Sequence, residues 1–171
     1  MRLGAQRLLA IALLLLGSVA ALGAGPVASG DEQAPTAAPD FVLPSIADGN
    51  VRLSELRGKV VVLAFWSSRC ADCDRHVARL ASLVERHRDR GARLLVVSID
   101  REPQASRELA AAMQAPVLLD AGRETARSYA LSLLPVTHFV DPHGRLRSTR
   151  AAARETDAEQ LERTLLALLD E

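Results

Sequence analysis

The sequence predicts an α/β fold in which helices flank a central mixed sheet. Two apolar runs, 60–66 and 94–99, lack the polar alternation of a half-exposed strand, so we expect both to be strands buried on two faces. Segments with helical periodicity follow each run, at 72–90 and 104–113. A hairpin and a last helix complete the pattern toward the C-terminus. This alternation is typical of one sheet covered by helices, and it predicts a single folded domain over 39–171.

The remaining elements follow from turn residues and short apolar segments. Extended segments at 41–43 and 51–53, joined by a turn at 47–50, predict an N-terminal β-hairpin extension. A helical turn at 54–57 is expected to end at Gly58. Further strands are expected at 117–119, at 137–140 and from Arg145 onward, and further helices at 124–130 and after an Asp157 cap.

Composition and charge are compatible with a globular core and give no sign of nucleic-acid binding. Of the 171 residues 49% are hydrophobic but only 3% are aromatic, so the core must consist mostly of Leu, Val and Ala. The 21 basic and 21 acidic side chains give a formal net charge of zero. Proteins that bind nucleic acid need an excess of positive charge to neutralise phosphates, so the balanced charge argues against that class.

The N-terminal 24 residues have the pattern of a secretory signal peptide. Two arginines precede an apolar run at 8–16, and small residues at 18–20 suit cleavage by a signal peptidase. The alternative is an uncleaved anchor, because 8–24 approaches the roughly 17–25 residues of a spanning helix. Either pattern places the domain outside the cytoplasm, for example in a periplasm, where disulfides persist. The Gly-, Ala- and Pro-rich stretch at 25–38 is expected to be a flexible linker.

The only two cysteines, Cys70 and Cys73, lie where the apolar run 60–66 gives way to the helical segment 72–90. A C-x-x-C pair at a strand-to-helix junction suits reversible disulfide chemistry. Unpaired N–H groups and the helix dipole stabilise a thiolate there, and the thiolate is the attacking form. We expect Cys70 to be the catalytic nucleophile and Cys73 the resolving thiol. The alternatives are a structural disulfide and half a zinc site, although two cysteines cannot form a four-cysteine site.

Four segments, in the same order and spacing, resemble the TlpA/ResA group of extracytoplasmic thioredoxin-like proteins. They are a first motif at 38–41, the approach to the first core strand at 53–60, the cysteine segment at 65–73 and a proline loop with its hairpin at 134–144. The resemblance covers nearly all of the chain from Ala38 onward. It implies a thioredoxin-like fold, and it implies that Pro135 is cis, lies against the disulfide and helps to pair an incoming peptide.

The same resemblance implies an activity and its partners. It indicates a thiol–disulfide oxidoreductase that works outside the cytoplasm, usually as a reductant, and needs no cofactor or metal. A membrane thiol reductase would supply the electrons, and the substrates would be exported proteins that contain disulfides, for example c-type cytochromes during maturation. The sequence departs from the family at Ala71 and Asp72, between the cysteines, where relatives often have prolines.

Further residues are assigned to the expected active site. Trp66 is expected to pack beside the disulfide. Asp100 and Glu102 follow the second buried strand; either could relay a proton to Cys73, or both could belong to a solvated acidic turn. His76 shares a helix face with Cys73, and we expect it to be a solvated helix residue.

Two other functions use the same thiols. A peroxiredoxin-like peroxidase carries the motif P-x-x-x-T-x-x-C, but here Ser67 takes the threonine position and Leu63 the proline position. A copper metallochaperone could bind Cu(I) through both cysteines, with His76 or His138 assisting.

Overall fold

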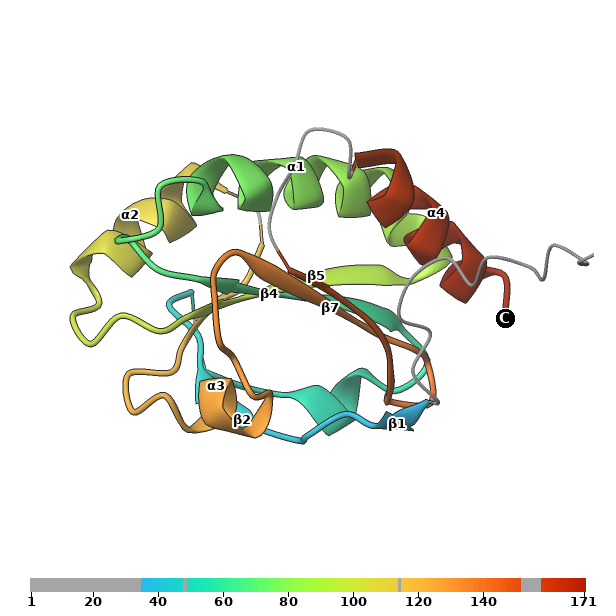
Figure 1. The fold of residues 1–171 in the computed structure, drawn as a ribbon, viewed down its shortest axis with the longest axis horizontal. Coiled ribbons are helices and arrows are strands. Elements are labelled where there is room, and N and C mark those ends of the chain that lie inside the picture. Colours follow the sequence, from blue (N-terminus) through green and yellow to red (C-terminus); the bar gives the residue numbers. More distant parts are fainter. Residues whose placement is uncertain (1–34, 48, 114, 152–157) are drawn as a thin grey trace, which may run out of the picture. The chain divides into compact units, whose positions relative to one another are not determined.

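The computed structural model describes residues 35–47, 49–113, 115–151 and 158–171, which form a mixed sheet between two layers of other elements (Figure 1). The sheet has six strands in the order β1-β8-β7-β4-β5-β6. These strands are β1 Thr36–Ala37, β4 Val60–Trp66, β5 Ala92–Ser98, β6 Val117–Leu119, β7 Val136–Val140 and β8 Arg145–Ala151. β4, β5 and β6 run parallel, whereas β7, β8 and β1 are joined to the sheet in antiparallel pairs.

Helices cover one face of the sheet, and a hairpin and a short helix cover the other. Figure 1 shows α1, α2 and α4 over one face and α3 with β2 under the opposite face. The helices are α1 Cys73–Arg86, α2 Gln104–Ala112, α3 Glu124–Ser128 and α4 Ala158–Leu169; the hairpin is β2 Val42–Pro44 with β3 Asn50–Arg52, followed by the 3-10 turn η1 Leu53–Leu56. The expected α/β class with a mixed sheet and an N-terminal hairpin is confirmed.

Strand β4 lies at the centre of two hydrophobic cores. Every residue of β4 is buried, which explains why its sequence shows no polar alternation. Successive side chains of a strand point to opposite faces. Val62, Ala64 and Trp66 therefore pack under α1 and α4, and Val61, Leu63 and Phe65 pack toward α3 and the hairpin.

The first long helix ends earlier than its sequence pattern predicts. The expected helix at 72–90 is split, because α1 ends at Arg86 and a separate 3-10 turn, η2 Arg88–Arg90, follows it. The break lies at His87, whose N–H donates to the Val84 carbonyl and closes the last turn. Gly91 then leaves η2 with a left-handed φ of 101°, as its role as a stop residue requires.

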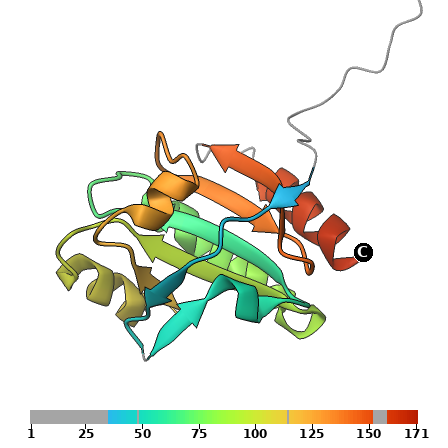
Figure 2. The ribbon, with the colours of Figure 1, turned by 90° about the horizontal axis from the view of Figure 1, so that it is seen from below.

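The folded unit begins earlier than the expected boundary at residue 39. Thr36 pairs with Leu146, and the Ala38 N–H donates to the Gly144 carbonyl at 3.0 Å. Figure 2 shows β1 beside β8 at the edge of the sheet. The last residues of the expected linker at 25–38 therefore belong to the sheet. Their strand, β1, pairs with backbone groups at the edge of β8. The rest of that linker, the expected signal peptide at 1–24 and the Asp157 cap lie outside the described residues.

No helix in the described ranges is both long enough and apolar enough to cross a membrane.

Candidate active site

Cys70 and Cys73 form a disulfide between the end of β4 and the start of α1. Their sulfur atoms are 2.11 Å apart and their Cα atoms 5.4 Å apart. The Cys70 N–H donates to the Ser67 carbonyl and the Cys73 N–H to the Cys70 carbonyl, so tight turns place both sulfurs at the N-terminus of the helix. Cys73 is fully buried, whereas Cys70 is partly exposed. Of the two sulfurs, only that of Cys70 can be reached by an incoming thiol or disulfide.

Trp66 connects the end of β4 to the first turn of α1. Its ring is buried in the same core as Cys73, and its Nε1–H donates to the Asp74 carboxylate at 2.7 Å. Asp74 lies in the first turn of α1, where a negative charge is favoured by the helix dipole. The structure therefore shows Trp66 as a buried core residue tied to the first turn of α1, and its packing beside the disulfide stays a prediction.

Asp100 holds the loop that leads into the disulfide. Its carboxylate accepts hydrogen bonds from the Ser67 hydroxyl at 2.5 Å and the Ser68 N–H at 2.9 Å. Burial by itself raises the pKa of Asp100, but these hydrogen bonds outweigh it and hold the pKa below its ordinary value. Glu102 is exposed, and no hydrogen bond or ion pair ties its side chain to another described residue. Its relay role stays a prediction, and Asp100 is the acid that touches the active-site loop.

The proline loop faces the disulfide across a cavity of about 700 Å³. The Leu134–Pro135 peptide bond is cis, as the family resemblance implies. Pro135 is buried and lines this cavity together with Cys70. The other lining residues are Ser67, Arg69, Ala71, Asp72, Ile99, Arg123, Ala126, Arg127, Leu131, Ser132, Leu133 and Leu134. Nothing in the sequence marks Arg123 and Arg127 as neighbours of the cysteines, because only the fold brings α3 to this cavity.

His76 is buried, so the expectation that it is a solvated helix residue is wrong. Only 4% of its surface is exposed, and its Nε2 lies 2.6 Å from the Thr137 hydroxyl of β7. His76 follows Cys73 by three positions and precedes Leu80 by four, so it falls on the helix face that packs against the sheet. A hydrogen-bonding partner on β7 lets a polar side chain occupy that face.

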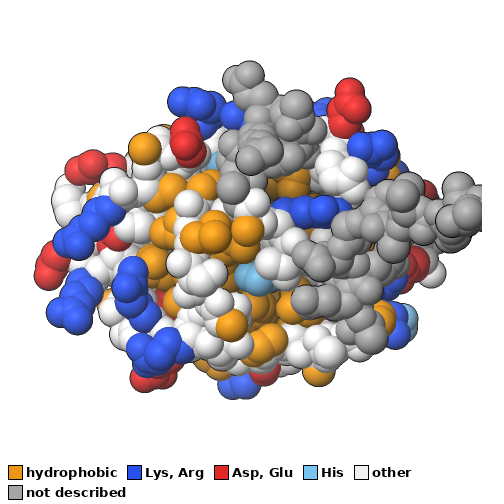
Figure 3. Space-filling model, in the orientation of Figure 1, with side chains coloured by type: hydrophobic (Ala, Val, Ile, Leu, Met, Phe, Trp, Pro, Cys, Tyr) orange, Lys and Arg blue, Asp and Glu red, His pale blue; other side chains and the backbone are white. Residues whose placement is uncertain are grey.

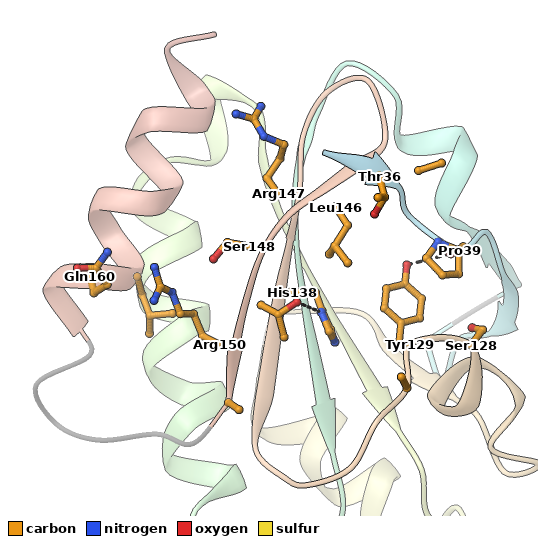
Figure 4. Close-up of a pocket in the computed structure, with 15 residues that line it drawn as sticks. Thr36, Pro39, Ser128, Tyr129, His138, Leu146, Arg147, Ser148, Arg150 and Gln160 are labelled. Atoms are coloured by element: carbon orange, nitrogen blue, oxygen red, sulfur yellow. Dashed lines mark hydrogen bonds between the residues drawn. The ribbon is translucent and has the colours of Figure 1, made fainter. Parts of the chain in front are cut away.

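A second cavity, of about 730 Å³, lies against β8 and contains neither cysteine (Figure 4). His138 lines it from β7, with its Nδ1 2.9 Å from the Thr149 hydroxyl and its ring against those of Phe65 and Tyr129. Thr137 faces α1 instead, so the two neighbours point to opposite faces, as their strand positions predict. Burial lowers the pKa of His138 to about 4, and its Nε2 has no hydrogen-bond partner among the described residues.

This pKa predicts a pH-dependent loss of stability. The unfolded chain binds a proton at His138 below pH 6.5, whereas the folded chain binds it only near pH 4, so unfolding becomes easier as the pH falls through that window. The effect should reach about 3 kcal/mol near pH 4. We expect His138→Phe to flatten the pH dependence of urea unfolding between pH 6.5 and 4. His143→Phe, on an exposed turn, is the matched control and should keep the wild-type slope; equal slopes in both variants would refute the prediction.

The fold and the site define a thioredoxin-like protein whose C-x-x-C disulfide faces a cis-proline loop. The chain belongs to the AhpC/TSA family, whose sequence profile matches residues 35–149. A crystal structure of a Chlorobium tepidum protein named thiol:disulfide interchange protein DsbE superposes with a TM-score of 0.75 and 28% identity, covering 81% of this chain and 99% of that one.

Curated bacterial relatives carry related names. The chain is 32% identical over 113 residues to the thiol-disulfide oxidoreductase ResA of Geobacillus kaustophilus, a match that covers 64% of each protein. It is 29% identical over 111 residues to ResA of Bacillus subtilis, covering 64% of this chain and 62% of that protein. The matched part is therefore somewhat less than two thirds of the length of these relatives.

Proposed function

We propose that the protein is a thiol–disulfide oxidoreductase that acts through Cys70 and Cys73. The observation that carries the proposal is the unequal exposure of the two sulfurs. Cys70 opens onto a cavity next to Pro135, whereas Cys73 is sealed in the core at the first residue of α1. This arrangement gives one sulfur access to a substrate and keeps the other for the intramolecular step. The names of the relatives support the same activity.

The reaction balances as two successive thiol–disulfide exchanges. In the reduced protein the Cys70 thiolate attacks one sulfur of a substrate disulfide, which forms a mixed disulfide and releases the other substrate sulfur as a thiolate. Cys73, after losing its proton, attacks the Cys70 sulfur. The substrate leaves as a dithiol, and the Cys70–Cys73 disulfide seen in the structure remains. Two electrons pass from the protein to the substrate, and a donor must return them before the next cycle.

The setting and direction belong to the same proposal. The signal pattern at 1–24 supports a site of action outside the cytoplasm, where a protein disulfide can persist. There the protein would reduce disulfides in exported proteins, such as c-type cytochromes during maturation, and a membrane thiol reductase would re-reduce it. The resemblance to the ResA group supports this direction of electron flow.

Peroxidase and copper-carrier functions use the thiols differently. Leu63, at the position of the peroxidase proline, is fully buried in β4 and pairs with β5 and β7. Within the described ranges, no group of three or more His, Cys, Asp or Glu side chains is arranged to hold a metal ion. One accessible and one buried sulfur suit the two successive steps of dithiol exchange, so we prefer that function.

A Cys73→Ser variant tests the mechanism, because it removes the thiol that resolves the mixed disulfide. Incubated in reduced form with a synthetic peptide that contains an internal C-x-x-C disulfide, the variant should accumulate a one-to-one covalent adduct that mass spectrometry detects and dithiothreitol releases. Wild-type protein should form no lasting adduct and should turn the peptide into its dithiol. The double variant Cys70→Ser/Cys73→Ser is the control and should form none. Failure of Cys73→Ser to form an adduct while Cys70 remains reduced would refute the proposal.

A further inference from the structure

The cavity beside Cys70 combines an apolar lining with basic side chains. Ile99, Ala126 and Leu134 contribute apolar lining, and Leu133 is one of two large apolar side chains found exposed in the described part of the chain. Three arginines line the same cavity: Arg69 from the loop before Cys70, Arg123 at the N-cap of α3, and Arg127 within α3. Figure 3 shows basic side chains over the end of the molecule where α3 lies, with apolar surface between them.

None of these three arginines has an ion-pair partner within the described part of the chain, although several other arginines do. Of the three, only Arg69 is close enough to a carboxylate outside the cavity lining, that of Asp100, to help lower its pKa. Arg127 donates only to the backbone carbonyl of Gly122, at 2.9 Å. The one acidic side chain that lines the cavity is Asp72, and Arg75 lies 3.6 Å from its carboxylate. The lining therefore holds three positive charges against a single, partly neutralised negative one.

We propose that this cavity selects disulfide substrates in which acidic side chains flank the reactive cysteine; the inference rests on the proposed exchange at Cys70. A guanidinium group forms paired hydrogen bonds with a carboxylate, and exposed arginines around a concave site also speed the approach of an acidic partner. The apolar lining can hold a small hydrophobic residue next to the substrate cysteine, while the arginines contact the acidic residues beside it. The partner is thus a peptide segment with a cysteine, an apolar residue and nearby Asp or Glu.

The selectivity should be moderate and sensitive to salt. Each exposed arginine–carboxylate contact strengthens binding only a few-fold, so two or three contacts together should favour an acidic substrate by about tenfold at low salt. Because the arginines are exposed, 0.5 M NaCl should remove most of this preference. A preference that came from apolar contacts alone would persist at high salt.

Three peptides with the same internal disulfide and with acidic, neutral or basic flanks provide the test. We expect wild-type kcat/KM to be about tenfold higher for the acidic peptide than for the basic one. The variant Arg123→Glu/Arg127→Glu should reverse this ratio, and Arg123→Gln/Arg127→Gln should bring it close to one. Because the ratio compares two substrates of one preparation, a partly unfolded variant does not distort it. Arg163→Glu, on α4 outside the cavity, is the matched control and should keep the wild-type ratio.

The outcomes separate this inference from the function on which it rests. If wild-type protein reduces all three peptides with equal kcat/KM, the charge selectivity is refuted and the exchange activity stands. If it reduces none of them, the proposed function fails, and the substrate inference fails with it. A preference for acidic flanks that Arg163→Glu reverses as strongly as the α3 variants would show a general charge effect and would also overturn the assignment to this cavity.

Discussion

Replacing Cys70 with serine is expected to lower disulfide-reductase activity at least about a thousandfold, on the scale seen when other enzymes lose their nucleophile. A hydroxyl does not form the thiolate that attacks a disulfide, and the buried Cys73 cannot reach a substrate in its place. Reduction of a peptide disulfide, followed by the appearance of its free thiols, measures the loss.

Arg107→Ala provides the control for Cys70→Ser. Arg107 is exposed on α2 outside the cavity, and no hydrogen bond or ion pair ties its side chain to another described residue. Its alanine variant should keep activity within about twofold, because surface substitutions away from specific contacts have small effects. Residual activity of Cys70→Ser above a tenth of wild type would mean that Cys70 is not the attacking thiol.

The buried strands could be predicted from the sequence because their signal is local. β4 has the predicted bounds, Val60–Trp66, since a strand covered on both faces needs apolar side chains at every position. The end of α1 was predicted less well. The amphipathic pattern continues past Arg86 into η2, and the change from α-helix to 3-10 turn at His87 depends on backbone geometry that this pattern does not report.

Some residues of the candidate site could be predicted from local sequence, and others could not because the fold brings them together from distant positions. Cys70, Cys73 and Trp66 fall within one short motif, and the family resemblance supplied Pro135. The sequence predicted that Asp100 lies near the site but did not identify its contacts. That its carboxylate holds Ser67 and Ser68 follows from β5 lying next to β4, so that residues 32 and 33 positions apart meet.

Contacts between residues far apart in the sequence also explain why His76 and His138 are buried. His76 and His138 have similar local sequence signals, a polar ring within or beside an apolar pattern. One meets a hydroxyl of β7 and the other a hydroxyl of β8, across 61 and 11 residues respectively. Burial of a histidine is possible at both positions because the neighbouring strand offers a partner, and that partner is visible only once strand order and register are known.

The Asp141→Ala substitution is expected to lower the free energy of unfolding by about 2–3 kcal/mol, because it removes a buried acceptor of several hydrogen bonds, two of them from partly exposed guanidinium groups. The Asp141 side chain is fully buried. It accepts hydrogen bonds from the backbone N–H groups of His143 and Arg145 at 2.9 Å, and from the Arg145 and Arg147 guanidinium groups at 2.7 and 3.3 Å. Without the carboxylate, two backbone N–H groups and the Arg145 guanidinium lose this partner, while Arg147 keeps Glu171.

The turn that Asp141 organises also joins distant parts of the domain. Next to it, Gly144 adopts a left-handed φ of 75° and accepts a hydrogen bond from Ala38, while the Pro142 carbonyl accepts one from Gly58. Burial raises the pKa of Asp141, but hydrogen bonds from Arg145 and Arg147 outweigh it and lower the pKa below 3.8. The contribution of Asp141 to the free energy of unfolding is therefore complete above pH 3.8, and it is lost as the pH falls through the lowered pKa of the folded state.

Urea unfolding at pH 7, followed by circular dichroism, measures this contribution. Asp141→Asn keeps an oxygen that can accept the backbone hydrogen bonds but loses the charge, so its destabilisation should be smaller than that of Asp141→Ala. Asp89→Ala removes an exposed carboxylate that forms no ion pair within the described residues, and it should change stability by less than about 0.5 kcal/mol. If Asp141→Ala costs no more than Asp89→Ala, the network contributes little, and the short turn itself must hold the β7–β8 hairpin together.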